Sequence, residues 1–310
     1  MPELPEVQTV VNDLNKKVVG RKITGAWFDW PKMIKDPLDQ SKNKVAHKHV
    51  AVFEKFLTGE KIVEAKRRAK NILIYLTHDK LLLVHQKMTG HMLVGKWRIK
   101  NKESGIKNQE VIPLEPKAMI TDPYNKYVHL ILYLDNGKML ALSDLRKFAK
   151  VIAGSVQEIE NLPELTNLGP DALDPNLTVE KFGATLRQAQ GKKIYQVLMD
   201  QQVIAGIGNI YANEILWLAK VYPLTPTYKL TTSQLKNLYR ATRKILPRAL
   251  KLRGTSTSDF RDTDGMKGKY GNELLVYQRG GEPCFRCKTK IKRVSMGGRS
   301  AHFCPKCQKA

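Results

Sequence analysis

Long apolar runs are missing from this 310-residue sequence. No stretch of eighteen consecutive apolar residues occurs, which excludes a membrane-spanning helix. The first residues, Met1 to Glu6, show neither a basic start nor an apolar core, so we expect no signal peptide. Internal repeats and low-complexity tracts are absent as well. The composition, 42% hydrophobic and 26% charged, indicates a folded globular chain with one large domain or two to three small ones.

Acidic residues are scarce. The chain has 29 Asp and Glu against 53 Lys and Arg, which gives a formal net charge of +24. Such an excess favours a polyanionic partner, nucleic acid first and an anionic membrane surface second. A lysine-rich proteome, which raises the charge of every protein, is the alternative explanation.

Cysteine is absent from the first 283 residues. The four that exist are Cys284, Cys287, Cys304 and Cys307, two C-x2-C pairs separated by sixteen residues. This spacing predicts one tetrahedral zinc ion, and a structural one because four thiolates leave no open coordination position. Two disulfides are the alternative, which a reducing compartment disfavours. His302 lies close enough in sequence to compete as a ligand, but we expect it to be a bystander.

Hydrophobic periodicity divides the chain into a β-rich part and a helical part. Apolar residues from Val7 to Val18 recur at helical spacing, with Pro5 at the start and Gly20 at the end. From residue 22 to 152 short β-like runs follow, such as 71–76, 81–85 and 127–133. Asn136-Gly137 marks a hairpin turn. Many short strands predict a β-sandwich or a barrel. The polar stretch 99–123 carries no pattern, and we expect a long exposed loop there.

Beyond Pro163 the sequence becomes helical. Helices are predicted near residues 178–188, 192–201, 210–219 and 232–252, followed by a Gly-, Ser- and Thr-rich segment at 254–271 that we expect to be a mobile loop. The zinc module comes last. The fold class predicted is therefore α+β: an N-terminal helix plus a β-sandwich domain, a helical helix–two-turn–helix domain and a C-terminal zinc ribbon.

The N-terminus offers an unusual nucleophile. If Met1 is removed, Pro2 becomes the terminal residue and its secondary amine can form an iminium with an electrophilic carbon. Glu3 and Glu6 lie beside it on the same helix start. Ordinary helix-start chemistry, which also favours Pro and Glu in the first turn, is the alternative explanation.

Three further motifs suit phosphate groups. Gly206-Ile207-Gly208-Asn209 precedes a helix, with Asn209 expected at the cap and free N–H groups suited to a phosphate. Lys70 ends a basic run directly before a strand. Arg299 follows Gly297-Gly298 at a predicted hairpin tip between the cysteine pairs, a good position for a phosphate contact. A structural turn, a solvated basic face and a solvated arginine are the respective alternatives.

Together these motifs resemble the formamidopyrimidine-DNA glycosylases, bacterial base-excision repair enzymes, nearly end to end. The specific matches are the PELPEV start, RRAKNILIYL, GIGNIYANE, GNELLVYQRGGEPC and GGRSAHFCPKCQ. The related endonuclease VIII typically has Gly where this chain has Leu4, which favours the branch acting on oxidised purines. The resemblance implies four segments: a catalytic β-sandwich domain (1–155), a helix–two-turn–helix domain (156–253), a lesion-capping loop (254–271) and a zinc finger (272–310).

The resemblance also implies roles for individual residues. Pro2 matches the nucleophile that attacks C1′ of the damaged nucleoside, Glu3 the acid that helps open the sugar, and Glu6 a supporting carboxylate. Lys70 matches a lysine that holds phosphate and assists elimination. The remaining matches are DNA contacts: Asn209 and Arg299 at the backbone of the flipped nucleotide, Met88, Arg146 and Phe148 as a wedge that fills the vacated stack, and Tyr127, Tyr277 and Lys192 or Lys193 elsewhere.

This chain departs from the family's pattern at several positions. The family's Gly-Met-Ser-Gly is Lys87-Met88-Thr89-Gly90, and its Asp-Pro-Arg-Arg-Phe-Gly is the sequence from Asp144 to Ala149. A DNA-contacting histidine of the first domain appears as Tyr127, with His129 two residues later. The stretch 99–123 has the appearance of an insertion.

The function implied is that of a bifunctional glycosylase and AP lyase. It would flip 8-oxoguanine and formamidopyrimidines out of double-stranded DNA, excise them, and cleave the strand by β,δ-elimination through a Schiff base. The resemblance further implies one structural Zn2+, a monomer, no membrane partner, and a place in the bacterial cytoplasm with the nucleoid. An endonuclease VIII-like glycosylase for oxidised pyrimidines and a non-catalytic zinc-ribbon nucleic-acid-binding protein are the alternatives.

Overall fold

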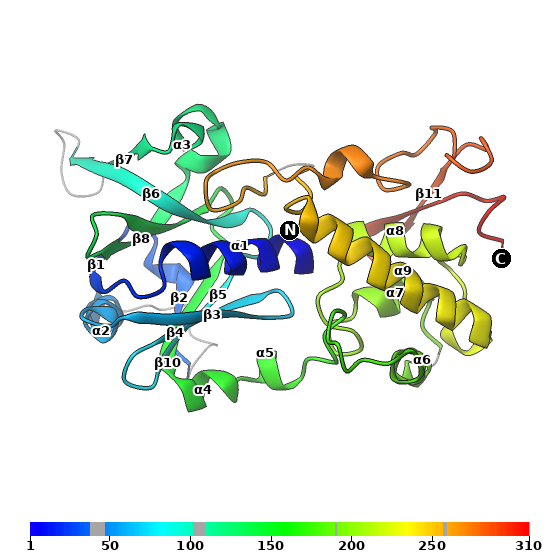
Figure 1. Ribbon diagram of the computed structural model, residues 1–310, viewed down its shortest axis with the longest axis horizontal. Helices are drawn as coiled ribbons and strands as arrows, with labels where there is room; N and C mark the ends of the chain where they lie inside the picture. The colour runs from blue at the N-terminus through cyan, green and yellow to red at the C-terminus, as the bar shows by residue number, and fades with distance from the viewer. Residues whose placement is uncertain (38–46, 102–108, 190, 257–258, 310) are drawn as a thin grey trace. The chain divides into compact units, whose positions relative to one another are not determined.

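The computed structural model of the chain describes residues 1–37, 47–101, 109–189, 191–256 and 259–309 (Figure 1). These residues form two compact units. The first contains Met1–Pro2, Glu6–Thr166 and Arg253–Gly268, and the second contains Glu3–Pro5, Asn167–Leu252 and Lys269–Ala310. Within the described ranges, no helix is both long enough and apolar enough to cross a membrane.

Two five-stranded sheets make up most of the first unit. One has the order β1-β8-β9-β6-β7 and the other β2-β10-β5-β4-β3, and apolar side chains from both sheets meet in one core. The predicted sandwich is therefore confirmed, and the barrel alternative is not. The strands are β1 (Ile23–Phe28), β2 (Ile34–Lys35), β3 (Ile62–Arg68), β4 (Asn71–Leu76), β5 (Lys80–His85), β6 (Gly90–Asn101), β7 (Gln109–Glu115), β8 (Val128–Leu134), β9 (Met139–Asp144) and β10 (Lys150–Ser155).

Helix α1 (Leu4–Lys17) supplies part of the same core. Its side chains Val7, Val10, Val11 and Leu14 are at most 2% exposed, as their helical spacing predicts. The chain leaves the helix through Gly20, whose φ of +83° suits glycine. The other short helices of this unit are η1 (Pro31–Met33), α2 (His47–Leu57), α3 (Lys117–Thr121), η2 (Pro123–Lys126), α4 (Val156–Glu160) and α5 (Pro163–Thr166).

The prediction of a loop over 99–123 is wrong for the residues described, while 102–108 lie outside them. Strand β6 continues to Asn101 and pairs with β7 as an antiparallel ribbon, and α3 follows. Met119 of α3 packs with Leu93, Trp97 and Val128 on the second face of this sheet. Strand β7 contacts only one neighbouring strand and is half-exposed, so the sequence carries little hydrophobic alternation by which to recognise it.

The second unit is helical, as predicted. Its core consists of side chains from α6 (Val179–Gln188), α7 (Ile194–Met199), α8 (Asn209–Ala219) and α9 (Thr232–Lys251). Thr178 and Thr231 cap α6 and α9 by accepting backbone N–H groups, which explains where these helices begin. The turns between α7 and α8 make the expected helix–two-turn–helix element. The described part of this unit also contains two short helices, η3 (Thr227–Lys229) and η4 (Tyr270–Glu273).

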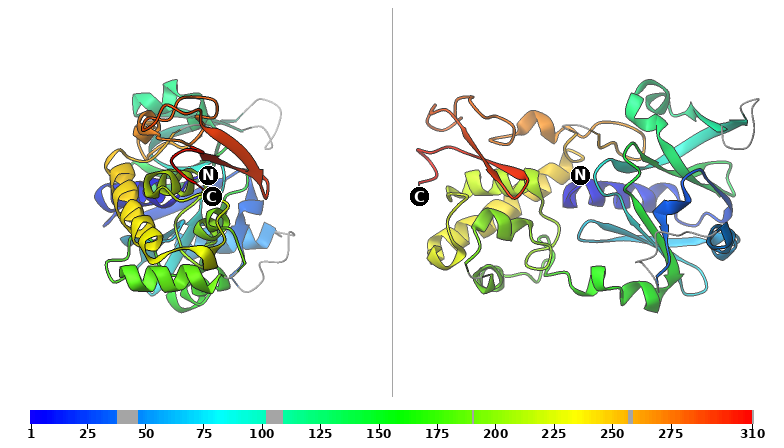
Figure 2. Two further views of the ribbon diagram at one scale, coloured as in Figure 1. Left: turned by 90° about the vertical axis from the view of Figure 1, so that its right-hand side faces the viewer. Right: turned by 180° about the vertical axis from the view of Figure 1, so that it is seen from behind.

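Strands β11 (Lys292–Met296) and β12 (Arg299–Phe303) form the hairpin of the zinc module, drawn in red in Figure 2. The turn residues Gly297 and Gly298 have φ values of +58° and +73°, which is the backbone of a two-residue hairpin turn and confirms the predicted tip. The hairpin is tied to α8, because Asn213 accepts the N–H of His302 at 2.5 Å.

Acid stability of the first unit should depend on Glu60. Burial raises the pKa of this carboxyl, but hydrogen bonds from Lys80, Thr77 and His78 outweigh it and lower the pKa from 4.5 to about 2. A carboxyl whose pKa is lowered on folding stabilises the folded state at any pH above its pKa in the unfolded chain. This stabilisation is lost as the pH falls toward 2. We expect Glu60→Gln to cost as much as about 3 kcal/mol at pH 7 and much less near pH 2.5.

Urea unfolding of both proteins across this pH range measures the difference. Glu64→Gln is the control, since Glu64 is an exposed carboxylate on the neighbouring strand. A difference between wild type and Glu60→Gln that does not shrink on acidification would contradict the assignment.

Candidate functional site

The carboxylate of Glu3 lies at the N-terminus of α8. It is buried and accepts the backbone N–H groups of Gly208 at 2.7 Å, Ile210 at 2.9 Å and Tyr211 at 3.4 Å. The predicted phosphate site on these amides is therefore wrong: the chain's own carboxylate occupies the helix end, where negative charge is stabilised. The sequence indicates an anion-binding turn here. It does not indicate that the anion is a carboxylate of the same chain, 205 positions away.

Two glycines make this arrangement sterically feasible. A Cβ at Gly208 would lie 2.4 Å from the Glu3 carboxyl carbon, and one at Gly206, whose φ is +103°, would lie 2.6 Å from Leu4. The N–H of Leu4 also donates to the carbonyl of Gly206 at 3.0 Å. Glu3 and Leu4 are therefore fixed on this turn, and Pro2 is covalently attached to the fixed segment.

Asn209 is the first residue of α8 rather than its cap, which is Gly208. Its side-chain oxygen accepts the hydroxyl of Tyr195 at 2.5 Å and the amide of Asn213 at 3.3 Å. The expectation that Asn209 caps the helix is therefore wrong by one residue. Its side chain forms hydrogen bonds with Tyr195 and Asn213 and caps no backbone N–H group.

Tyr195, which the sequence analysis missed, has several predicted site residues around it. Burial raises the pKa of its phenol to about 12, with Glu3 adding to the rise and Arg299 opposing it. Tyr277 also raises the pKa of Tyr195, and the pKa of Tyr277 is itself raised by burial and by Glu3. The only hint in the sequence was its helical spacing toward an apolar core, which does not identify a polar role.

Arg299 opens β12 and is exposed. Its guanidinium donates to the sulfur of Met199 at 3.6 Å, and the amide of Asn213 donates to the neighbouring Ser300 carbonyl at 3.3 Å. The second unit thus gathers Glu3, Asn209, Tyr277 and Arg299 near the start of α8. Tyr277 is held there because the buried carboxylate of Glu214 accepts its N–H at 2.9 Å.

The two candidate lysines before α7 differ in their surroundings. Lys192 is 58% exposed at its side chain and pairs with Asp200 at 3.1 Å, whereas Lys193 is the residue before the helix. Which of them contacts a ligand stays a prediction.

In the first unit, Lys70 directly precedes strand β4 and is buried. The register of β4, β5 and β10 sets Asn71 and Lys150 on either side of His85. Burial is the main reason that the pKa of His85 falls to about 3, and three ammonium groups add to it, those of Lys87, Lys70 and Lys150. The imidazole is therefore neutral at physiological pH, and among these ammonium groups that of Lys150 is paired with the carboxylate of Glu164.

Met88, Arg146 and Phe148 form an exposed cluster in the first unit. The Arg146 guanidinium lies 4.6 Å from the centre of the Phe148 ring and 3.9 Å from the sulfur of Met88. Met88 and Phe148 are 44% and 52% exposed, which is unusual for large apolar side chains. Met88 and Arg146, 58 positions apart in sequence, are brought together here, and their role as a wedge stays a prediction.

Asp144 fixes the two turns that carry this cluster. Its buried carboxylate accepts the hydroxyl of Thr89 and the N–H groups of Arg146 at 3.2 Å and Ala149 at 2.6 Å. Lys87 on the other turn adopts φ +55°, a left-handed conformation that suits the glycine of the family's motif. Tyr127 is adjacent, since its carbonyl accepts the N–H of Asp144 at 2.8 Å.

Glu6 and the predicted mobile segment 254–271 are held together. Glu6 is buried and accepts the N–H of Thr255 at 2.6 Å, while Gly254 leaves no room for a side chain beside it. Residues 257–258 lie outside the described part. For the rest, the prediction of a loose loop is wrong: residues from Phe260 to Thr263 are buried, and ion pairs join this segment to the first unit. The polar composition of 254–271 thus predicted the absence of long helices and strands correctly, but it did not predict that part of the segment is buried.

The four cysteines converge in the second unit. Their Sγ atoms all lie within 4.8 Å of one another, and two of the separations are 3.3 and 3.4 Å. Tetrahedral zinc with bonds of about 2.3 Å requires sulfur separations of about 3.8 Å, so the cluster fits one Zn2+ and confirms the predicted site. His302 is not part of the cluster, and its ring packs edge-on against Tyr277 at 5.5 Å.

Family models match three stretches of the chain. The formamidopyrimidine-DNA glycosylase N-terminal domain matches residues 1–151, the H2TH domain of the same enzymes matches 168–261, and the zinc finger found in FPG and IleRS matches 281–310. The chain belongs to the formamidopyrimidine-DNA glycosylase family. This confirms the family suggested by the sequence motifs, and with it the class of enzyme, a DNA glycosylase.

Individual relatives match over their full length. The formamidopyrimidine-DNA glycosylase of Chloroflexus aurantiacus is 37% identical over 309 residues, which cover 99% of this chain and 98% of that protein. Lactococcus lactis Fpg bound to abasic-site DNA has a TM-score of 0.80 at 30% identity, covering 99% of this chain and all of that one. The same protein bound to DNA with an N7-benzyl-Fapy-dG gives 0.80 at 31% identity with full coverage of both.

Zinc removal should disorganise only the module that carries Arg299. We expect Cys304→Ser to lower bound zinc from about one per chain to well below it and to weaken DNA binding, because metal binding supplies folding free energy to such modules. The unfolding transition of the β-sandwich should remain. Zinc content of freshly purified protein and thermal unfolding followed by circular dichroism measure both effects. His302→Gln is the control and should retain zinc; stoichiometric zinc in Cys304→Ser would refute the site.

Proposed function

We propose that this chain is a bifunctional DNA glycosylase and AP lyase that removes oxidised purines, 8-oxoguanine and formamidopyrimidines, from duplex DNA. The observation that carries the proposal is the fixed N-terminus: three backbone N–H groups at the start of α8 hold Glu3, and Pro2 directly precedes Glu3 in the chain. Anchoring of this kind restricts where a terminal amine can lie, which is what covalent catalysis by that amine requires.

The chemistry begins once Met1 has been removed. With Met1 attached, the Pro2 nitrogen is an amide and cannot act as a nucleophile. The free secondary amine attacks C1′ of the damaged nucleoside as the bond to the base breaks, and the proton that the amine loses goes to the departing base. Opening of the sugar breaks the C1′–O4′ bond, O4′ takes a proton, and an iminium remains on Pro2. Glu3 is the proposed proton donor for ring opening, and Glu6 a supporting carboxylate.

Strand cleavage follows from the iminium. It acidifies the C2′ protons, so that loss of one expels the 3′ phosphate, and a second elimination expels the 5′ phosphate. Lys70 is the proposed phosphate contact that assists these steps. Its ammonium group lies near His85 together with those of Lys87 and Lys150, and a concentration of basic groups of this kind attracts phosphate, which supports this role.

The exposed cluster of Met88, Arg146 and Phe148 is the proposed wedge. A base within a duplex is out of reach, so it must be flipped and the vacancy filled. The Phe148 ring offers an apolar face for stacking, and the Arg146 guanidinium above it offers donors to the base left unpaired. Asn209 and Arg299 are proposed to grip the backbone of the flipped nucleotide. Further DNA contacts are proposed for Tyr127, Tyr277 and Lys192 or Lys193.

We further propose that the protein acts as a monomer on nucleoid DNA in a bacterial cytoplasm. Bacterial relatives and the net charge of +24 support this. A second candidate substrate class is oxidised pyrimidines, because a solved structure of Lactococcus lactis Fpg, similar at a TM-score of 0.79, contains DNA with an oxidised pyrimidine. Excision rates on 8-oxoguanine and thymine glycol duplexes would rank the two classes.

The nucleophile can be tested by borohydride trapping. Reduction of the iminium should leave the enzyme covalently joined to a duplex with 8-oxoguanine opposite cytosine. We expect Pro2→Gly to trap poorly and a form that retains Met1, verified by intact mass, not to trap at all. Equal trapping by the form with Met1 would show that another amine is the nucleophile.

Salt dependence separates the backbone contacts from the wedge. Each phosphate contact contributes a slope of about 0.9 to log K against log salt. Arg299→Ala should flatten the slope by about one contact and weaken binding to damaged and undamaged duplexes alike. Phe148→Ala should leave the slope unchanged and reduce excision more than binding, because flipping costs a few kcal/mol.

The controls are chosen from residues of the same type and exposure. Phe285→Ala removes an exposed phenylalanine of the second unit, and Arg21→Ala removes an exposed arginine of the first. Both should behave as wild type. The proposed roles are wrong if Phe148→Ala alters the slope as Arg299→Ala does.

A further inference from the structure

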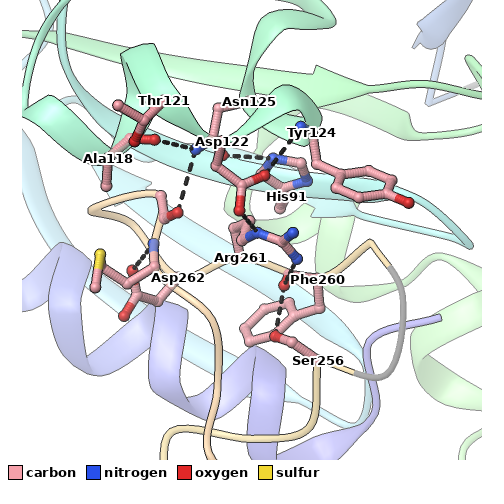
Figure 3. A network of polar contacts seen from close by, with 12 residues as sticks. His91, Ala118, Thr121, Asp122, Tyr124, Asn125, Ser256, Phe260, Arg261 and Asp262 are labelled. Atoms are coloured by element: carbon pink, nitrogen blue, oxygen red, sulfur yellow. Dashed lines mark hydrogen bonds and ion pairs between the residues drawn. The ribbon is translucent and has the colours of Figure 1, made fainter.

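Arg261 is a buried arginine in the segment between Arg253 and Gly268. Its side chain is 1% exposed, and Figure 3 shows it among residues of the first unit. The guanidinium donates to Asp122 through Nε at 2.7 Å and to the carbonyl of Phe260 through Nη1 at 2.8 Å, and it lies 4.8 Å from the centre of the Tyr124 ring. A buried cation with this many partners has one well-defined orientation.

The carboxylate that receives it is fixed in turn. Asp122 lies between α3 and η2, and its second oxygen accepts the N–H of Tyr124 at 3.0 Å. Burial would raise the pKa of Asp122, but the hydrogen bonds from Arg261 and Tyr124 outweigh it and lower the pKa. The pair is therefore charged at neutral pH.

A second contact between the same two parts of the chain is made by Asn125, three residues after Asp122. The amide of Asn125, which is fully buried, donates to the carbonyls of Gly265 at 3.1 Å and Ala118 at 3.0 Å, and its oxygen faces His91 at 3.2 Å (Figure 3). Gly265 has a φ of +79°, and a Cβ there would lie 2.5 Å from the Asn125 amide. The turn from Arg261 to Gly265 is thus pinned at both ends to α3 and η2.

The first contact comes from a part of the chain that departs from the family's pattern. Residues 99–123, which have the appearance of an insertion, supply β7, α3 and Asp122, while Asn125 of the second contact follows them in η2. The segment that the two contacts hold lies within the region 254–271, which the resemblance assigns to lesion capping. A salt bridge buried in this way adds little stability over a well-packed apolar pair, so its main physical effect is to fix orientation.

We propose that the Arg261–Asp122 pair positions the segment 259–266 for recognition of the damaged base, and that Arg261 therefore governs base excision but not cleavage of a site that has no base. This inference rests on the proposed glycosylase function. Arg261 acts through the segment it holds, as a positioning residue, and Asp122 at the end of α3 serves as its support.

The test compares two substrates in single-turnover reactions: a duplex with 8-oxoguanine opposite cytosine, and the same duplex with a preformed abasic site. We expect Arg261→Met to lower the excision rate about tenfold or more, and to change abasic-site cleavage by less than about twofold. Arg261→Lys, which keeps the charge but places its donors on a single nitrogen, should recover part of the excision rate.

A purely structural role is excluded by a double variant. Arg261→Met with Asp122→Leu removes both charges, so it should regain the thermal stability lost in the single variant while excision stays low. The control is Arg248→Met, which breaks an exposed pair with Glu273 in the second unit and should leave both rates unchanged. The double variant also provides a folded protein if the single one does not fold.

Three results would overturn the inference: unchanged excision in Arg261→Met, an equal fall of both rates, or recovery of excision together with stability in the double variant. Failure of the proposed function is distinguishable from these, because the wild-type protein would then act on neither duplex.

Discussion

The contact on which the candidate site depends most is the one between the Glu3 carboxylate and the start of α8. A helix N-terminus presents unpaired N–H groups and a partial positive charge, and it attracts any nearby anion. In this chain the anion is the protein's own third residue, at 2.7 to 3.4 Å from three N–H groups. The two glycines before the helix are consequences of this contact, since each would otherwise place a Cβ against Glu3 or Leu4.

The distribution of charge follows a related logic. The acidic side chains at the described site are already engaged: Glu3 and Glu214 accept backbone N–H groups, and Asp144 organises two turns. They therefore orient parts of the protein. His85, whose pKa burial and the neighbouring ammonium groups lower to about 3, is neutral and adds no charge of its own.

Local patterns in the sequence predicted the parts of the structure that local forces determine. The spacing of Val7, Val10 and Leu14 was enough for α1, and that of the cysteines was enough for the zinc site, because each pattern is periodic or has one chemical explanation. The proximity of Met88, Arg146 and Phe148 could be expected only from the resemblance, since Met88 and Phe148 carry no pattern of their own. Asn209 was misplaced by one residue because a glycine can cap a helix without any side-chain signal.

Contacts between distant segments could not be predicted in this way. Nothing near Gly208 indicates that Glu3 fills the anion site, and nothing near Arg261 indicates its pairing with Asp122. Distant contacts contribute to both errors about 99–123 and 254–271: each segment is polar and looks exposed in isolation, but Asp122 of the first forms a buried pair with Arg261 of the second. Polar residues report burial poorly when their partners lie far away in the chain.

The anchoring of Glu3 and Leu4 also sets a strict requirement on how the polypeptide is begun. The turn at Gly206 and Gly208 fits one carboxylate followed by one leucine, so the N-terminus cannot slide to compensate for extra or missing residues. Translation that starts one codon upstream, or a peptidase that trims one residue too many, would deliver a well-folded protein with the wrong group at its end. In the proposed reaction, start-codon choice and methionine removal would therefore determine which residue carries the reactive amine.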